Sequence, residues 1–248
     1  MKRILITRPR PQAKEFAEKL QASGYDPVFF PVIEIQPIEN NIALERALSK
    51  LDCYDWVVFT SVNAVQVAFD RHSFLVRDTG SGVKFAAIGP KTAEALQERG
   101  FQPDFVPEEY VAESILPGLG DLRGRWVLLP RAEIARKVLP EAICEAGGIA
   151  HEIAVYKTIP AEPDPQGLAA LKSGVDFITL TSSSTVRNFT AIARANGLDP
   201  LRLPGNPLFA CIGPVTEQTA REEGLINLVT AREFTTRGLI EVIDKVEV

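Results

Sequence analysis

The chain has 248 residues, of which 46% are hydrophobic and 24% are charged, a composition typical of a soluble globular protein and not of a disordered segment or a coiled coil. The length favours two domains of moderate size. The formal net charge of −5 makes nucleic acid a poor candidate partner, although a local cluster of cations still admits an anionic ligand. The chain has no apolar run long enough for a membrane span, and its N-terminal run is too short for a signal peptide. We therefore expect a cytoplasmic protein without a membrane partner.

The cysteines and histidines argue against a disulfide framework and against a metal centre. The chain has three cysteines, Cys53, Cys144 and Cys211, which are far apart in the sequence. We expect them to be reduced thiols of a cytosolic protein. The two histidines, His72 and His151, have no partners at ligand spacing. We expect no metal site.

Short apolar runs alternate with helical patterns along the chain. Strands buried on both faces are predicted at residues 4–7, 56–60, 85–88, 126–129, 177–180 and 208–212. Helices are predicted at residues 11–23, 62–71, 90–99, 132–146, 183–196 and 214–223. Several of these helices end at glycine, and weaker strands follow at 27–30, 103–106, 149–153 and 226–229. This alternation predicts an α/β fold with parallel sheets.

The chain also repeats itself once. Residues 4–8 align with 127–131 at an offset of 123, residues 55–61 align with 176–182 at 121, and residues 86–92 align with 210–216 at 124. Such a small drift in offset over half the chain indicates an internal duplication. We expect two similar domains.

Two extended segments bounded by proline, residues 31–38 and 154–164, are equivalent in the two repeats. They lie inside the repeats and not at their junction, so each repeat gives its first β-α-β unit to one domain and its remainder to the other. We predict a discontinuous first domain of residues 1–30 plus 165–248 and a second domain of residues 39–153. The two linkers would pair as a two-stranded hinge.

Hydroxyl side chains lie where several predicted strands end and helices begin. Helix capping is sufficient to explain them, because a Ser or Thr there accepts from the free N–H groups of the first turn. An anion site is the alternative, because the same groups donate hydrogen bonds and carry partial positive charge. The residues concerned are Thr60, Ser61, Thr181, Ser182 and Ser183.

A second kind of helix start places glycine at the cap and proline at the first helical position. It occurs at Gly89 with Thr92 and at Gly213 with Thr216. A stable helix start explains the pattern by itself, but glycine also lets a ligand approach the backbone closely. Ligands of open α/β sheets bind at the carboxyl ends of the strands. Two facing domains would therefore direct all four helix starts at one cleft, and their symmetry favours the anion site.

Arg8 and Arg10 follow the first buried strand, where an arginine serves either as a salt bridge or as a carboxylate ligand. Tyr156 lies in the second linker, where it is either an interfacial tyrosine with one hydrogen bond or a proton donor. The sequence lacks the motifs for NAD and ATP binding, because Gly89-Pro90-Lys91-Thr92 is not a P-loop. It also has no nucleophile elbow.

Taken in order, several motifs resemble the uroporphyrinogen-III synthase family over the full length of the chain. They are Ile-Leu-Ile-Thr-Arg-Pro at 4–9, Phe-Thr-Ser-x-Asn-Ala-Val at 59–65, Ile-Gly-Pro-x-Thr at 88–92 and 212–216, and Val-Tyr-Lys-Thr at 155–158. The resemblance implies two α/β domains joined by a two-stranded β-ladder. It also implies a cofactor-free cyclisation of hydroxymethylbilane, a linear tetrapyrrole with eight carboxylates, to uroporphyrinogen III with inversion of ring D and loss of water.

The resemblance assigns roles to particular residues. Tyr156 matches the family's hinge tyrosine, which is proposed to assist departure of hydroxide. Thr60, Ser182 and Thr216 match polar cleft positions, and Thr92 follows by the internal repeat. Asn63 and Lys91 join Arg8 and Arg10 as further substrate-binding candidates. We expect a monomer whose partner is the substrate, and a transient contact with the preceding pathway enzyme stays open.

Two rival interpretations come from other classes of protein. The first is a non-catalytic, two-domain cytosolic binder of a small polyanion, for which a hydroxyl at Tyr156 has no use. The second is a glycosyltransferase-like enzyme, which needs a nucleotide-sugar site and a stronger base than this sequence offers.

Overall fold

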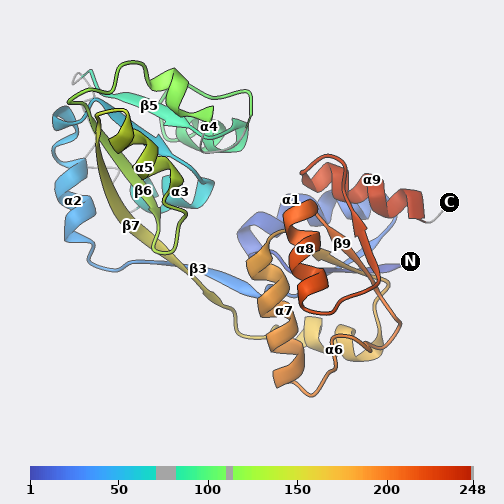
Figure 1. Ribbon diagram of the computed structural model, residues 1–248. Coiled ribbons are helices and arrows are strands. Elements are labelled where there is room, and N and C mark those ends of the chain that lie inside the picture. The colour runs from blue at the N-terminus through green and yellow to red at the C-terminus, as the bar shows by residue number, and fades with distance from the viewer. Residues whose placement is uncertain (71–81, 110–113, 247–248) are drawn as a thin grey trace. The chain divides into compact units, whose positions relative to one another are not determined.

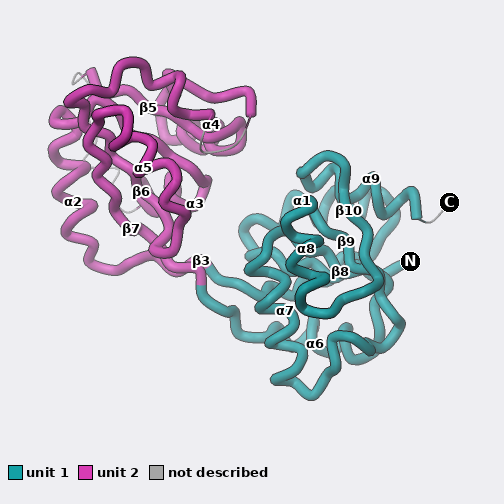
Figure 2. The backbone as a smooth tube through the Cα atoms, in the orientation of Figure 1, with its two compact units in different colours: residues 1–34, 159–248 teal, residues 35–158 magenta. Residues whose placement is uncertain are grey.

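The computed structural model describes residues 1–70, 82–109 and 114–246. The backbone divides into two compact units, shown in two colours in Figure 2. Unit 1 comprises Met1–Glu34 and Ile159–Val248, and unit 2 comprises Ile35–Thr158. Unit 1 is therefore assembled from both ends of the chain, and unit 2 is one continuous segment.

A five-stranded sheet with the order β10-β9-β8-β1-β2 forms the centre of unit 1 (Figure 1), and its strand pairs are parallel. The strands are β1 (Arg3–Ile6), β2 (Asp26–Phe29), β8 (Phe177–Leu180), β9 (Leu208–Cys211) and β10 (Leu228–Thr230). The helices are α1 (Arg10–Ala22), α6 (Pro165–Ser173), α7 (Ser183–Ala195), α8 (Pro214–Glu222) and α9 (Thr236–Val246).

Successive side chains of a strand in unit 1 point to opposite faces of the sheet, and helices cover both faces, which gives three layers. Ile4 and Ile6 of β1 pack with α1 and α9, whereas Leu5 packs in the cluster formed with α6, α7 and α8. All three side chains are fully buried. A strand covered on both faces needs an uninterrupted apolar run, which is the pattern that the sequence shows here.

The sheet of unit 2 has the order β3-β7-β6-β4-β5. Its strands are β3 (Ile33–Pro37), β4 (Trp56–Phe59), β5 (Lys84–Ala87), β6 (Trp126–Ala132) and β7 (Ile149–Pro160). The helices are α2 (Ile42–Leu48), α3 (Val62–Asp70), α4 (Pro90–Gln97) and α5 (Val138–Glu145), with 3-10 turns η1 (Leu51–Cys53) and η4 (Leu116–Leu119). Helices α2, α3 and α4 pack on one face, and α5 and η4 pack on the other.

The two sheets have the same strand order when they are matched strand for strand. In unit 1 the order β2-β1-β8-β9 is continued by β10, and in unit 2 the order β7-β6-β4-β5 is continued by an isolated bridge between Ala86 and Phe105. In each sheet the central pair joins a strand from one half of the chain to a strand from the other half.

Most of the predicted elements are confirmed to within two residues, but several are corrected. The helix predicted at residues 132–146 begins only at Val138, because β6 continues to Ala132 and pairs there with Tyr156 of β7. The strand predicted at 103–106 is reduced to the bridge at Phe105, since Pro103 and Pro107 cannot donate to a ladder. The strand predicted at 226–229 forms at Leu228–Thr230.

Within the described residues, three α-helices were not predicted, namely α2, α6 and α9. Residue 71, the predicted end of the helix over 62–71, lies outside the described residues. Gly24, Gly147 and Gly224 confirm the predicted glycine ends, because they have positive φ just after the C-cap residues of α1, α5 and α8. Gly100 also has positive φ, but it lies three residues beyond the end of α4.

Candidate functional site

Each sheet has one pair of neighbouring strands from which the following strands of the chain are added in opposite directions. In unit 1 this pair is β1 and β8, and in unit 2 it is β6 and β4. Loops that leave the carboxyl ends of such a pair diverge to opposite faces and leave room for a ligand. Some of the predicted site residues follow these strands, namely Arg8 and Arg10 after β1, Thr181–Ser183 after β8, and Thr60, Ser61 and Asn63 after β4. The others follow the neighbouring strands β5 and β9, except Tyr156, which lies within β7.

The start of α7 in unit 1 is formed by hydroxyl side chains. The Ser182 Oγ accepts from the Thr185 N–H (3.2 Å), and the Thr185 Oγ1 accepts from the Ser182 N–H (3.0 Å), which completes a capping box. The Thr181 N–H also donates to the Thr185 Oγ1 (3.1 Å). Ser182 is therefore the N-cap of α7, whereas Thr181 takes part only through its backbone N–H. Ser183 has a different partner, because its Oγ hydrogen-bonds the Thr219 Oγ1 of α8 (2.7 Å).

Helices α4 and α8 begin without a side-chain cap. Gly89 and Gly213 hold the N-cap positions in extended backbone, and a proline opens each helix as predicted. Thr92 and Thr216 lie in the first turns and are buried. The Thr92 N–H donates to the Gly89 carbonyl (3.1 Å), so the backbone itself engages part of the first turn of α4.

The two glycine-capped helices differ in charge. In the first turn of α8, hydrogen bonds from Thr230 and then Arg221 lower the pKa of Glu217, so this carboxylate stays ionised at neutral pH. The first turn of α4 has no acidic residue, and it carries Lys91, whose Nζ lies 3.8 Å from Glu94. The start of α4 is therefore the more favourable of the two for an anionic group.

Arg8 and Arg10 have different surroundings. Burial lowers the pKa of Arg8, while the charge of Glu15 raises it, and the guanidinium donates to Gln12 (3.4 Å). Arg10 forms an ion pair with Asp164 and lies over the ring of Phe29, 5.5 Å from its centroid. Arg10 thus pairs with a carboxylate, whereas the guanidinium of Arg8 contacts a neutral amide.

In unit 2, Ser61 and Tyr156 meet at the start of α3. The Ser61 Oγ accepts from the Ala64 N–H (3.1 Å), as a helix cap does, and it also hydrogen-bonds the Tyr156 Oη (3.2 Å). Tyr156 is 7% exposed. Thr60 and Asn63 lie on either side of this contact in the chain and are half-buried. The Ile88 N–H donates to the Phe59 carbonyl (3.0 Å), so the starts of α3 and α4 leave adjacent strands.

A β-bulge in β7 turns Tyr156 towards Ser61. Opposite β6, Arg131 pairs with Ala154 and Ala132 pairs with Tyr156, so Val155 has no partner. Simple alternation would place Val155 and Tyr156 on opposite faces of the sheet. Both instead belong to the cluster that packs with α2, α3 and α4. The sequence contains no local signal for this bulge.

Arg131 follows the core of β6 as Arg8 follows β1, so the sequence leaves it the same two roles, a salt bridge or a carboxylate ligand. This side chain is buried between Glu152 of β7 and the turn at residues 133–137.

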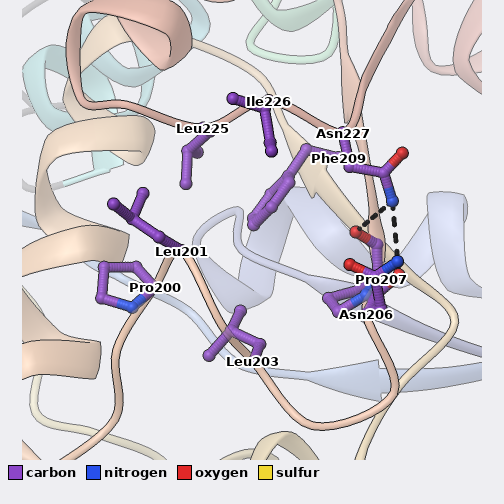
Figure 3. A pocket seen from close by; sticks show the side chains of 9 residues that line it. All are labelled: Pro200, Leu201, Leu203, Asn206, Pro207, Phe209, Leu225, Ile226 and Asn227. Atoms are coloured by element: carbon purple, nitrogen blue, oxygen red, sulfur yellow. Dashed lines mark hydrogen bonds between the residues drawn. The ribbon is translucent and has the colours of Figure 1, made fainter.

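The pocket in Figure 3 belongs to unit 1 and is formed by other residues. It encloses about 250 Å³ at the amino ends of β9 and β10, between Leu201, Leu203, Phe209 and Leu225. The predicted site residues do not line it. Across the described parts of the chain, we find no group of three or more His, Cys, Asp or Glu side chains that could hold a metal ion. Nor does any described helix have the length and apolarity needed to cross a membrane.

Comparisons with known proteins agree with this architecture. A family model described as uroporphyrinogen-III synthase HemD matches residues 14–241. Uroporphyrinogen-III synthase of Synechococcus elongatus is 32% identical over 98% of this chain and 95% of that protein. The enzyme of the same name from Chlorobaculum parvum is 28% identical over 91% of both chains.

Solved structures share the fold. The mutant uroporphyrinogen III synthase of Thermus thermophilus superposes with a TM-score of 0.63 at 22% identity, covering 99% of this chain and 98% of that chain. The Helicobacter pylori uroporphyrinogen-III synthetase gives a TM-score of 0.64 at 19% identity, with 99% and 100% coverage. These matches define a class of α/β proteins with two mostly parallel sheets.

The family match and the 32% identity go further than the fold. The chain belongs to the uroporphyrinogen-III synthase family, and the resemblance inferred from its motifs is confirmed. It is a lyase of porphyrin and haem biosynthesis.

Proposed function

We propose that this chain cyclises hydroxymethylbilane to uroporphyrinogen III, with inversion of ring D and loss of water, and that Tyr156 donates the proton to the leaving hydroxyl group. The observation that carries the residue assignment is the hydrogen bond between Tyr156 Oη and Ser61 Oγ at the carboxyl edge of unit 2. Membership of the family supports the reaction and disfavours a non-catalytic binder.

The proposed first step breaks the bond between the ring A hydroxymethyl carbon and its oxygen. The phenol of Tyr156 gives its proton to the departing oxygen, which leaves as water, and ring A becomes a cationic azafulvene. The Ser61 hydroxyl then donates to the phenolate oxygen, while its own oxygen still accepts from the Ala64 N–H (3.1 Å). This pair stabilises the charge that develops on Tyr156 without a metal ion.

The later steps need conformational control more than acid–base chemistry. The substituted carbon of ring D attacks the azafulvene and forms a spiro intermediate, which fragments and closes again with ring D inverted. The proton released in the final closure restores the phenol, so that the net loss is one water. Without enzyme the bilane closes with ring D unflipped, so the protein must favour the other geometry.

We propose that the helix starts bind the carboxylates of the substrate. Helices α4 and α8 begin at Gly89 and Gly213 without a side-chain cap, and Arg8 adds a cation at the end of β1. Each charge-assisted hydrogen bond contributes about 1.5–3 kcal/mol, so several moderate contacts are enough for a ligand with eight carboxylates. The further members of this proposed set are Arg10, Thr60, Ser61, Asn63, Lys91, Thr92, Thr181, Ser182, Ser183 and Thr216.

We also propose that the two sheets arose by internal duplication with exchange of the first β-α-β unit. The matching strand orders of the two sheets support this origin. The proposed domains are residues 1–30 plus 165–248 and residues 39–153, and the proposed hinge is formed by residues 31–38 and 154–164. In support, the boundaries between the units fall at Glu34 and Thr158, within these two linkers.

A cytosolic monomer completes the proposal. The three cysteines are unpaired, as is usual in a reducing compartment. Light scattering on the eluted protein tests the oligomeric state, and a mass of twice the 27.2 kDa chain would contradict a monomer.

The Tyr156→Phe variant tests the proposed proton donor, because it removes one oxygen and keeps the ring. We expect a large loss of turnover with an unchanged circular dichroism spectrum. Thr190→Val is a matched control, since it also removes a buried hydroxyl group but lies on α7 in unit 1. Turnover like that of the wild type in Tyr156→Phe would remove this residue from the mechanism.

A further inference from the structure

Arg131 fastens the turn at residues 133–137 to strand β7. Its Nη1 donates to the Glu152 Oε2 (3.0 Å), and its Nη2 donates to the Arg136 carbonyl (2.6 Å). Lys137 also reaches Glu152, with 2.9 Å between its Nζ and the Oε1. The guanidinium therefore joins the carboxyl end of the turn to the part of β7 that precedes the bulge.

The same turn is attached to β7 on the other side of the bulge. The Glu133 N–H donates to the Tyr156 carbonyl (2.8 Å), and the Glu133 carboxylate pairs with Lys157 (3.0 Å). The backbone of Tyr156 is thus held by a turn whose shape depends on Arg131. The bulge at Val155 lies between these two attachments.

The neighbouring backbone is held by residues that follow β3. The Asn41 Nδ2 donates to the Ala154 carbonyl (2.7 Å), and the Ile38 N–H donates to the Val155 carbonyl (2.9 Å). The carbonyl groups of residues 154, 155 and 156 are therefore all engaged. Because these hydrogen bonds fix the bulge, they also fix the direction of the Tyr156 side chain.

Burial of the Arg131 side chain costs free energy, which a purely structural role does not explain. It is 8% exposed, and its Nε is buried with no hydrogen-bond partner among the described residues. Such a group in a folded protein calls for an explanation. A lysine would avoid the orphaned donor, but it lacks the planar fork that meets two separate acceptors.

We propose that Arg131 is a positioning residue for Tyr156: by fixing the turn at residues 133–137, it maintains the bulge that holds the Tyr156 hydroxyl group at Ser61. This inference rests on the proposed role of Tyr156 as the proton donor. Arg131 touches no reacting atom in this account and acts only through the backbone of β7.

The test is a double-mutant cycle on turnover with Arg131→Lys and Tyr156→Phe. A misplacement of about 1 Å can cost a factor of about 100, so we expect Arg131→Lys to lower kcat by about 10- to 100-fold with KM within about twofold. In the Tyr156→Phe background the same substitution should change kcat by less than about twofold, because the group that it positions is absent.

A control variant, a second variant of the bulge and a hydrogen-exchange measurement complete the test. Arg125→Lys is the control, because it weakens the ion pair of Arg125 with Asp55 (2.7 Å) just before β6 begins, and it should leave kcat unchanged. Asn41→Ser keeps a capping oxygen for α2 but loses the donor to Ala154, so it should lower kcat only when Tyr156 is present. Hydrogen exchange of the Glu133 amide reports its hydrogen bond to Tyr156 independently of activity, and protection should fall in Arg131→Lys.

The outcomes separate the two proposals. If Tyr156→Phe alone turns over like the wild type, the proton-donor role fails, and the positioning role fails with it. If Tyr156→Phe is slow but Arg131→Lys lowers kcat equally in both backgrounds, only the positioning role of Arg131 is overturned. Wild-type kcat and unchanged Glu133 protection in Arg131→Lys would overturn it as well. If Arg131→Lys does not fold, Asn41→Ser decides by the same comparison.

Discussion

The contact between Ser61 and Tyr156 predicts a measurable coupling in stability. Ser61→Ala deletes one oxygen that accepts from the Ala64 N–H (3.1 Å) and hydrogen-bonds the Tyr156 Oη (3.2 Å). Loss of the cap costs about 1 kcal/mol in the free energy of unfolding. Loss of the hydrogen bond costs about 1 kcal/mol more. The single variant should therefore be less stable by about 2 kcal/mol, and Tyr156→Phe by about 1 kcal/mol.

The double variant separates the two contributions. The shared hydrogen bond can be lost only once, so Ser61→Ala with Tyr156→Phe should cost about 2 kcal/mol and not the about 3 kcal/mol that independent effects would give. Ser61→Gly is a useful companion, because glycine at the N-cap costs only a few tenths of a kcal/mol and isolates the loss of the hydrogen bond.

Urea unfolding followed by tryptophan fluorescence suits this measurement. The chain has two tryptophans, Trp56 and Trp126, and both lie in unit 2 with Ser61 and Tyr156. Their signal therefore reports the unit that carries the substitutions. Costs that simply add in the double variant would refute the inferred coupling, because they would mean that the two hydroxyl groups do not interact in the folded protein.

Three further predictions follow from other contacts. Burial raises the pKa of Cys211 to about 12, so a thiol reagent at pH 8 should modify only the two exposed cysteines of the native protein, and a third rapidly reacting thiol would contradict this burial. The Gly167 N–H, and then Arg10, lower the pKa of the Asp164 carboxyl, so its charge stabilises the fold above about pH 4 and this contribution disappears as the pH falls. Asp164→Asn should therefore melt lower than the wild type at pH 7 and equally at about pH 2, whereas a constant difference would count against the linkage. Gly167→Ala would place its Cβ 2.4 Å from the Phe29 carbonyl oxygen, so it should destabilise unit 1 by about 1–3 kcal/mol in thermal melts, and an unchanged melting temperature would show that the backbone yields there.

Much of the fold could be predicted because it rests on local patterns. Buried strands of parallel sheets have apolar runs such as that of β8, and helix starts such as Gly213-Pro214 are encoded by the residues themselves. The repeat indicated that the strand ends of both halves carry similar polar residues, and the structure places Ser61 and Ser182 at equivalent helix starts.

The orientation of Tyr156 could not be predicted, because it depends on contacts that are distant in sequence. Alternation along β7 would place Tyr156 opposite Val155, and the bulge that reverses this is held by Arg131, Glu133 and Asn41. The turn at residues 133–137 explains the wrong start of the helix predicted at 132–146, because Glu133 and Lys137 contact β7 and Arg131 binds the Arg136 carbonyl. Long-range hydrogen bonds override a helical pattern here.

The product isomer is the most direct test of the central claim. The purified chain would be supplied with hydroxymethylbilane, the products oxidised, and the two uroporphyrin isomers separated by chromatography. We predict an excess of isomer III over isomer I, which forms spontaneously from the same substrate. Isomer I alone, produced in the presence of protein with a native circular dichroism spectrum, would contradict the proposed function.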